Sequence, residues 1–188
     1  CPACRPASSP IRGLPAVPQR TRARAHNIGA MSLAPLSPPP AEADAALASV
    51  MDRIREAAAR GQVLRIRGGG SKDFYGEPAQ EGDALSTAGL SGIVNYEPSE
   101  LVVTVRAGTP LAQLEALLAA QGQCLPFEPP HFGGGATVGG MVAAGLSGPA
   151  RASVGSVRDY VLGARIVNGR GQLLVFGGQV MKNVAGYD

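Results

Sequence analysis

The residues of this chain best suited to chemistry are its glycines, which gather in two clusters beside polar side chains. The chain has 26 glycines among 188 residues, about twice the usual share in proteins, and nearly all lie after residue 60. Residues 68–70 are followed by Ser71 and Lys72, and a second cluster spans residues 133–140. Glycine turns beside a strand or a helix start present bare N–H donors to a phosphate. Two such turns suit a polyphosphate, and a dinucleotide would satisfy both.

The familiar nucleotide motifs do not account for these clusters. Residues 70–72 read Gly-Ser-Lys, so they lack the Gly-Lys-Ser/Thr order of a Walker loop and its Mg²⁺-binding hydroxyl. Residues 133–140 do not fit G-x-G-x-x-G because Val138 occupies the last glycine position. The ATPase and NAD-Rossmann interpretations are therefore disfavoured. A lone glycine triplet would indicate only a tight turn, but two clusters and a third turn at Gly155 favour ligand binding.

Individual polar residues leave alternatives open. His131 could hydrogen-bond a ligand or act as an acid–base group, but a loop histidine with local hydrogen bonds is the simpler interpretation. Lys72 suits phosphate neutralisation and simple solvation equally. Arg158 and Asp159 could pair with each other or approach the ligand. With two histidines in the chain and His26 near its start, no Ser-His-Asp set or metal cluster emerges. No catalytic residue and no metal site are predicted.

Regular elements must position the first cluster. Residues 41–60 have the spacing of an amphipathic helix that ends at Gly61. Residues 63–67 form a short β-type run that stops at the glycines. The apolar side chains on one face of the helix are Leu47, Val50, Met51, Ile54 and Ala58.

The second cluster follows a strand and a helix. Residues 101–106 predict a strand, Thr109 is the expected N-cap, and Pro110 is expected at the first helical position. That helix should end at Gly122. The glycines then run into a short helix of small residues. Further on, residues 161–167 and 173–176 flank an Asn-Gly-Arg-Gly turn, which indicates a β-hairpin. The apolar face of the first of these helices comprises Leu111, Leu114, Leu117 and Leu118.

Residues 1–40 differ from the rest in composition. They hold nine prolines and five arginines and no Asp or Glu, which predicts a disordered tail. An upstream-extended translation with Met31 as the true start is the simpler explanation, and an organellar transit peptide is the alternative. The whole chain carries +3, so the remaining residues are slightly acidic and give no support to nucleic-acid binding.

Six segments occur in an order that resembles a known family. The body resembles FAD-binding domains of the vanillyl-alcohol oxidase and p-cresol methylhydroxylase (PCMH) type. More narrowly, it is similar to the E subunits of bacterial glycolate oxidases. The segments are RGGGSK at 67–72, GIVNYEP at 92–98, LPFEPPH at 125–131, GGMVA at 139–143, GSVRDYVLG at 155–163 and MKNVAGYD at 181–188.

The resemblance implies an α+β fold, a PCMH-type FAD-binding domain of two α/β subdomains with the cofactor extended between them. We expect residues 1–40 to be a tail and residues 41–188 to be this domain, truncated at its C-terminus and lacking the cap domain. Relatives with covalent flavin carry a histidine in the pyrophosphate loop, whereas Ser71 and Lys72 stand here. We therefore expect non-covalent FAD, and no catalysis by this segment alone.

The resemblance also implies three groups of FAD contacts. The loop whose amides hold the pyrophosphate comprises Arg67, Gly68, Gly69, Gly70, Ser71 and Lys72. The second wall comprises Thr137, Gly139, Gly140 and Ala143. The residues nearest the ribityl and flavin end are Gly155, Ser156 and Asp159. The first two groups agree with the backbone argument, and the third rests on resemblance alone.

The implied function is oxidation of a 2-hydroxy acid, glycolate to glyoxylate, through FAD. The implied partners are a homologous flavin subunit and an iron–sulfur subunit of a glycolate oxidase complex. One alternative is a non-catalytic structural or electron-relay subunit of the same complex, and a weaker one is binding of another nucleotide. No apolar run is long enough to cross a bilayer, and three cysteines are too few for a disulfide framework. The expected location is cytoplasmic, with peripheral association with the inner membrane through the complex left open.

Overall fold

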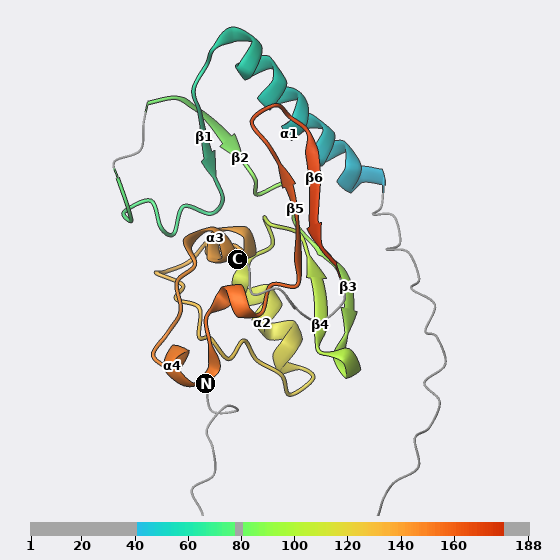
Figure 1. The fold of residues 1–188 in the computed structure, drawn as a ribbon, viewed down its shortest axis with the longest axis vertical. Helices are drawn as coiled ribbons and strands as arrows, with labels where there is room; N and C mark the ends of the chain where they lie inside the picture. The colour runs from blue at the N-terminus through green and yellow to red at the C-terminus, as the bar shows by residue number, and fades with distance from the viewer. Residues whose placement is uncertain (1–40, 78–80, 179–188) are drawn as a thin grey trace, which may run out of the picture. The chain divides into compact units, whose positions relative to one another are not determined.

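The computed structural model describes residues 41–77 and 81–178. The predicted tail, Met31 and the segment 181–188 lie outside the described residues. Helices and strands are mixed along the chain (Figure 1), as the α+β prediction requires. In chain order the elements are α1 Ala41–Arg60, β1 Leu64–Arg67, β2 Asp83–Ser86, β3 Ile93–Glu97, a 3₁₀ turn Pro98–Glu100, β4 Val102–Val105, α2 Leu111–Ala119, α3 Val138–Ala144, α4 Arg151–Val154, a 3₁₀ turn Val157–Asp159, β5 Gly163–Val167 and β6 Leu173–Gly177.

The strands pair two by two. Strands β1 and β2 are parallel, with Leu64 opposite Asp83 and Arg67 opposite Ser86. Strands β3 and β4 are antiparallel, as are β5 and β6. None of the helices in the described part of the chain combines the length and apolarity that crossing a membrane requires. The parallel pair matters most for function, because β1 leads directly into the first glycine cluster.

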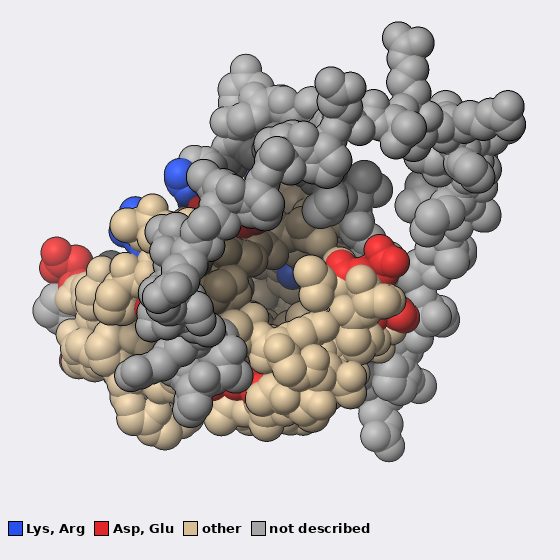
Figure 2. All heavy atoms as spheres, turned by 90° about the horizontal axis from the view of Figure 1, so that it is seen from below, with Lys and Arg blue, Asp and Glu red and all other residues tan. Residues whose placement is uncertain are grey.

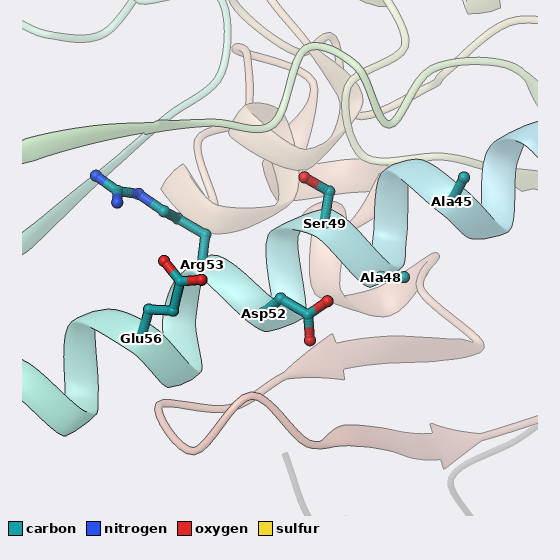
Figure 3. A pocket seen from close by; sticks show the side chains of 6 residues that line it. All are labelled: Ala45, Ala48, Ser49, Asp52, Arg53 and Glu56. Carbon is teal, nitrogen blue, oxygen red and sulfur yellow. The ribbon is translucent and has the colours of Figure 1, made fainter.

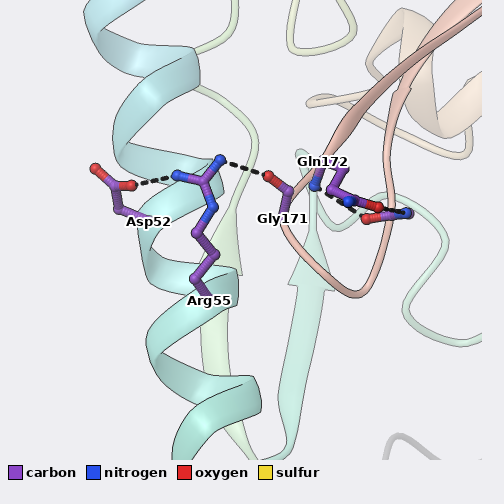
Figure 4. Close-up of polar contacts among 5 residues, drawn as sticks. Asp52, Arg55, Gly171 and Gln172 are labelled. Atoms are coloured by element: carbon purple, nitrogen blue, oxygen red, sulfur yellow. Dashed lines mark hydrogen bonds and ion pairs between the residues drawn. The ribbon is translucent and has the colours of Figure 1, made fainter.

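Helix α1 confirms the amphipathic prediction for residues 41–60. It stops before Gly61, whose φ of +64° is a backbone conformation that glycine adopts without strain. Arg55 ties the helix to the β5–β6 hairpin, because its guanidinium donates to Asp52 at 2.7 Å and to the Gly171 carbonyl at 2.8 Å (Figure 4). Arg53 forms a second tie, to Asp83 on β2 at 2.8 Å. Helix α1 is thus anchored to both β1–β2 and the hairpin.

Helix α2 forms where predicted, but Thr109 does not cap it. Pro110 occupies the cap position without a side-chain hydrogen bond, and the helix begins at Leu111. The fully buried hydroxyl of Thr109 instead accepts from the Gly92 amide at 2.9 Å and donates to the Gly92 carbonyl at 3.1 Å. A buried hydroxyl needs such partners, so this one links the entry to β3 with the entry to α2. The N-cap prediction for Thr109 was therefore wrong.

One apolar cluster holds the second glycine cluster in place. Both α2 and α3 contribute to it, and Phe127 is 2% exposed within it. Burying such side chains stabilises the fold by roughly 1.5–3 kcal/mol each, which fixes the start of α3. The buried members are Leu111, Leu114, Leu118, Phe127, Ala136, Val138, Met141 and Val157.

The hairpin prediction is also confirmed. Strands β5 and β6 pair from Gly163 opposite Gly177 to Val167 opposite Leu173. In the connecting turn the Asn168 side chain accepts from the amides of Arg170 and Gln172, each at 3.0 Å. This is the local bonding that makes asparagine favourable in turns.

Candidate functional site

The first glycine loop, residues 68–72, follows directly from β1. The Arg67 carbonyl, at the end of the strand, accepts from the Thr87 amide at 3.0 Å. Beyond it the backbone leaves the sheet, with Gly70 at φ +75°. None of the amides of residues 68–72 donates a hydrogen bond to another residue that the structure describes. Gly69 is exposed and the other four residues are partly buried, so these successive donors are accessible to an anion from outside the chain.

The second glycine loop, residues 133–137, lies against the first. A Cβ atom built at Gly69 would be 1.5 Å from the Gly135 carbonyl oxygen, and one at Gly68 would be 2.7 Å from Thr137 Oγ1. Thr137 caps α3, and its hydroxyl accepts from the Gly140 amide at 3.2 Å. The two loops are therefore adjacent, as a ligand gripped by both requires. Only glycine at position 69 permits this approach.

A cavity of about 260 Å³ opens beside the two loops. Figure 2 shows one face of the molecule, where a hollow among uncharged residues contains the blue of an unlabelled basic side chain. The cavity is smaller than a whole-ligand pocket, so it suits one section of an extended molecule. Its lining comprises Ile66, Arg67, Gly68, Gly69, Gly70, Ser71, Lys72, Asp73, Tyr75, Thr137, Gly140, Ala143 and Ala144.

Lys72 provides an independent sign of an anionic ligand. Its Nζ atom is buried and has no hydrogen-bond partner among the described residues. The Nζ atom lies over the Phe132 ring, 5.8 Å from its centroid, and Phe132 packs edge-on against Phe74. An unpaired ammonium removed from water raises the free energy of the fold. A diphosphate in the cavity would satisfy that ammonium, and the alternative of a solvated lysine does not describe it.

Most of the predicted contact residues meet in this cavity, but Gly139 does not. All six residues of the predicted pyrophosphate loop line it, together with Thr137, Gly140 and Ala143. The Gly139 amide instead donates to the Ala107 carbonyl at 2.7 Å, and a Cβ there would lie 2.8 Å from Ala107 Cβ. This glycine lets α3 pack closely on the chain before α2. Its effect on a ligand is therefore indirect.

Four lining residues were missed, as was the contact made by Gly135. Ile66, Asp73 and Tyr75 flank the first glycine loop, and Ala144 follows Ala143 in α3. Extending each predicted segment by a few residues would have found them. No sequence signal singled out Gly135 from the other glycines of its cluster, because its role depends on contact with Gly69.

The third predicted group forms a local turn outside the cavity lining. The Ser156 amide and hydroxyl donate to one carboxylate oxygen of Asp159, at 2.7 and 3.0 Å. These hydrogen bonds, the backbone one first, lower the pKa of Asp159 below its ordinary value. Gly155 precedes them at φ +91°. The carboxylate is thus occupied within the turn, and contact of Gly155, Ser156 and Asp159 with a ligand stays a prediction.

His131 makes the local interaction that its sequence position indicated. Its Nε2 atom lies 2.9 Å from Glu115 Oε2 on α2, with both side chains about one third exposed. The pair fastens the start of the second glycine loop to α2. Within residues 41–77 and 81–178, no three His, Cys, Asp or Glu side chains form a group that could hold a metal ion.

A second hollow lies along the outer face of α1 (Figure 3). Its volume is about 520 Å³, but every lining residue comes from this one helix. Without a second wall it cannot enclose a ligand. The lining comprises Ala45, Ala48, Ser49, Asp52, Arg53 and Glu56. The cavity at the glycine loops therefore remains the candidate site.

Comparison with known proteins identifies the family of the chain. Residues 45–177 match the family model described as FAD binding domain, so the chain belongs to that family, and FAD is its cofactor. Unpaired amides and a buried ammonium fit the diphosphate bridge of such a cofactor.

Individual relatives give a narrower class of protein than the family model does. The chain is 54% identical over 140 residues to "Glycolate oxidase subunit GlcE" of Escherichia coli K12, covering 74% of this chain and 40% of that protein. It is 36% identical over 124 residues to a D-lactate dehydrogenase of Archaeoglobus fulgidus, covering 65% of this chain and 27% of the relative. It is 28% identical over 111 residues to "Glycolate oxidase subunit GlcD" of Bacillus subtilis, covering 59% and 23%. The chain thus spans less than half the length of these relatives, and the resemblance found in the sequence is confirmed.

Proposed function

We propose that this chain holds the diphosphate section of non-covalent FAD between its two glycine loops, within a flavin subunit of the glycolate oxidase type. One observation supports this best: at a single cavity, the five amides of residues 68–72 and the Nζ atom of Lys72 all lack a hydrogen-bond partner among the described residues. Amide donors and a cation together suit a doubly charged diphosphate better than a neutral ligand. The similarity to the GlcE subunit supports the choice of protein class.

The residues have distinct proposed roles. The amides of the first glycine loop and the Lys72 ammonium bind the phosphate oxygens. Thr137 holds the start of α3, so that Gly140 and Ala143 present a bare surface as the second wall. Gly155, Ser156 and Asp159 are proposed nearer the ribityl and flavin end, in the second of two subdomains. Since Ser71 and Lys72 follow the glycines, the chain offers no histidine there for a covalent flavin link.

The proposed reaction is oxidation of glycolate to glyoxylate. FAD, when bound, supplies the hydride acceptor for a 2-hydroxy acid. The share of this chain is to bind and orient the cofactor. The similarities to GlcE and GlcD subunits support a complex that contains a homologous flavin subunit. We also propose that this complex contains an iron–sulfur subunit. Its proposed location is cytoplasmic, with peripheral contact to the inner membrane.

The absorption spectrum of the purified full-length protein tests the cofactor proposal. We expect bound oxidised flavin that passes into the supernatant when the protein is precipitated with acid. A well-folded but colourless protein that takes up no added FAD would refute flavin binding. Flavin that stays with the precipitate would refute the non-covalent link.

The part played by this subunit in turnover is tested in the assembled complex. Gly140 lines the cavity, and replacing it by valine should expel FAD from this subunit alone. We expect glycolate oxidation to be lost with it. If the complex loses this flavin and still oxidises glycolate at the original rate, the subunit has a structural or electron-relay role instead.

A further inference from the structure

We infer that Arg67 and Asp73 form a clasp that holds the first glycine loop in its anion-binding conformation. Arg67 is then a positioning residue and not a phosphate ligand. The inference rests on the proposed FAD site and assigns a role within it.

The ion pair closes the loop from end to end. Arg67 is the last residue of β1, and Asp73 is the first residue after the loop. The Arg67 Nε atom donates to Oδ2 of Asp73 at 2.8 Å, and Nη2 lies 2.7 Å from the same oxygen as an ion pair. The guanidinium also covers Gly70, where a Cβ would lie 2.3 Å from Nη2. Both side chains are about half exposed, so the pair contributes what a surface ion pair does.

The two ends of the clasp are anchored differently. The Arg67 backbone is fixed in the sheet, because its carbonyl accepts from the Thr87 amide at 3.0 Å. Asp73 is held by its own amide, which donates to the Gly70 carbonyl at 3.2 Å, and by the Arg67 side chain. Glycines lose more conformational freedom on ordering than other residues. A clasp that orders them before the ligand arrives lowers the entropy lost on binding.

Electrostatics separates this role from direct phosphate binding. Asp73 lines the cavity, so its negative charge opposes an anionic ligand. If Arg67 contacted phosphate directly, removing the Asp73 charge would free Arg67 and strengthen FAD binding. If the pair is a clasp, removing that charge loosens the loop and weakens FAD binding. The two roles therefore predict changes of opposite sign.

The test is Asp73→Asn in the full-length protein, with the FAD dissociation constant measured by quenching of flavin fluorescence. We expect the constant to rise about three- to tenfold. Asp83→Asn is the matched control, because Asp83 also pairs with one arginine, Arg53, and lies outside the cavity lining. It should leave the constant unchanged. An unchanged or lower dissociation constant for Asp73→Asn overturns the clasp.

Hydrogen exchange in the flavin-free protein gives a second readout. The amides of residues 73 and 75, which donate to the Gly70 and Lys72 carbonyls at 3.2 and 3.0 Å, should exchange faster in Asp73→Asn than in the wild type, and unchanged exchange would contradict the clasp. The doubly exchanged variant, Arg67→Asp with Asp73→Arg, should restore part of the slow exchange. Since this readout needs no flavin, a wild-type protein that binds no FAD would sink the proposed function and leave the clasp to be judged by exchange alone.

Discussion

The Gly69 backbone lies directly against the Gly135 carbonyl oxygen, so closely that a Cβ at Gly69 would be 1.5 Å from it. These residues belong to loops far apart in the sequence. Their contact turns two separate glycine clusters into one surface beside a single cavity. The ligand interpretation depends on this contact, because a dinucleotide can be gripped by both loops only if they are neighbours.

Gly69→Ala should therefore abolish FAD binding. The added methyl group forces the loops apart, and we expect a loss of about 1–3 kcal/mol in the free energy of unfolding. Flavin titration and thermal unfolding measure the two effects. Gly134→Ala is the control, since a Cβ there meets nothing within 4 Å. Equal flavin affinity in wild type and Gly69→Ala would show that the loop contact is not required.

Lys72→Met should change stability and affinity in opposite directions. Without ligand, removing the unpaired ammonium should stabilise the fold by about 1 kcal/mol. With FAD, losing the cation should weaken binding about tenfold or more. Denaturant unfolding of the flavin-free protein and a flavin titration give the two values. Arg65→Met, which removes an exposed cation from β1 outside the cavity lining, should change neither by much. A Lys72→Met protein with undiminished FAD affinity would remove Lys72 from the site.

Thr109→Val should destabilise the protein by about 1–3 kcal/mol, because the Gly92 amide and carbonyl both lose their hydrogen bond to the buried Thr109 hydroxyl. Val has nearly the same shape, so the loss reports hydrogen bonding more than packing. Denaturant unfolding measures it. Thr104→Val, at a half-buried position on β4, is the comparison and should cost less. If both variants lose the same free energy of unfolding, the two hydrogen bonds of Thr109 do not stabilise the fold as proposed.

The lowered pKa of Asp159 predicts that the stability of the fold falls in acid. Its pKa is lowered in the fold from an ordinary value of 3.8, so the folded state favours the carboxylate more than the unfolded state does. That contribution is present in full above pH 3.8 and is lost as the pH falls through the folded pKa. Asp159→Ala should therefore be less stable than wild type at neutral pH, with a gap that narrows below pH 3.8. Thermal unfolding across this range checks it, and a gap that is constant with pH would refute the Ser156 hydrogen bonds as its cause.

The sequence predicted the local elements well because their signals are local. The periodicity of residues 41–60, the glycine stop at Gly61 and the Asn-Gly-Arg-Gly turn each depend on neighbouring residues. Thr109 was mispredicted for a tertiary reason. A Thr-Pro pair suits a helix start, but a distant partner, Gly92, takes the hydroxyl. Local preference gives way when a buried polar group finds a better partner elsewhere.

In the candidate site, too, local properties could be predicted from the sequence and tertiary contacts could not. The glycine clusters could be read as ligand loops, since bare amides are a property of the residue type. The sequence could not show that Gly139 serves packing against Ala107, or that the Lys72 ammonium is buried. Both facts depend on which segments meet in space. The family resemblance supplied the third group of contacts, but Asp159 is bonded within its own turn.

The most direct test of the site is an amide chemical-shift titration of isotopically labelled full-length protein with unlabelled FAD. The account predicts that the amides of residues 68–72 shift most, while the Gly139 amide, already bonded to Ala107, shifts little. If flavin binds and the chemical shifts of the amides of residues 68–72 do not change, the diphosphate does not lie between these loops.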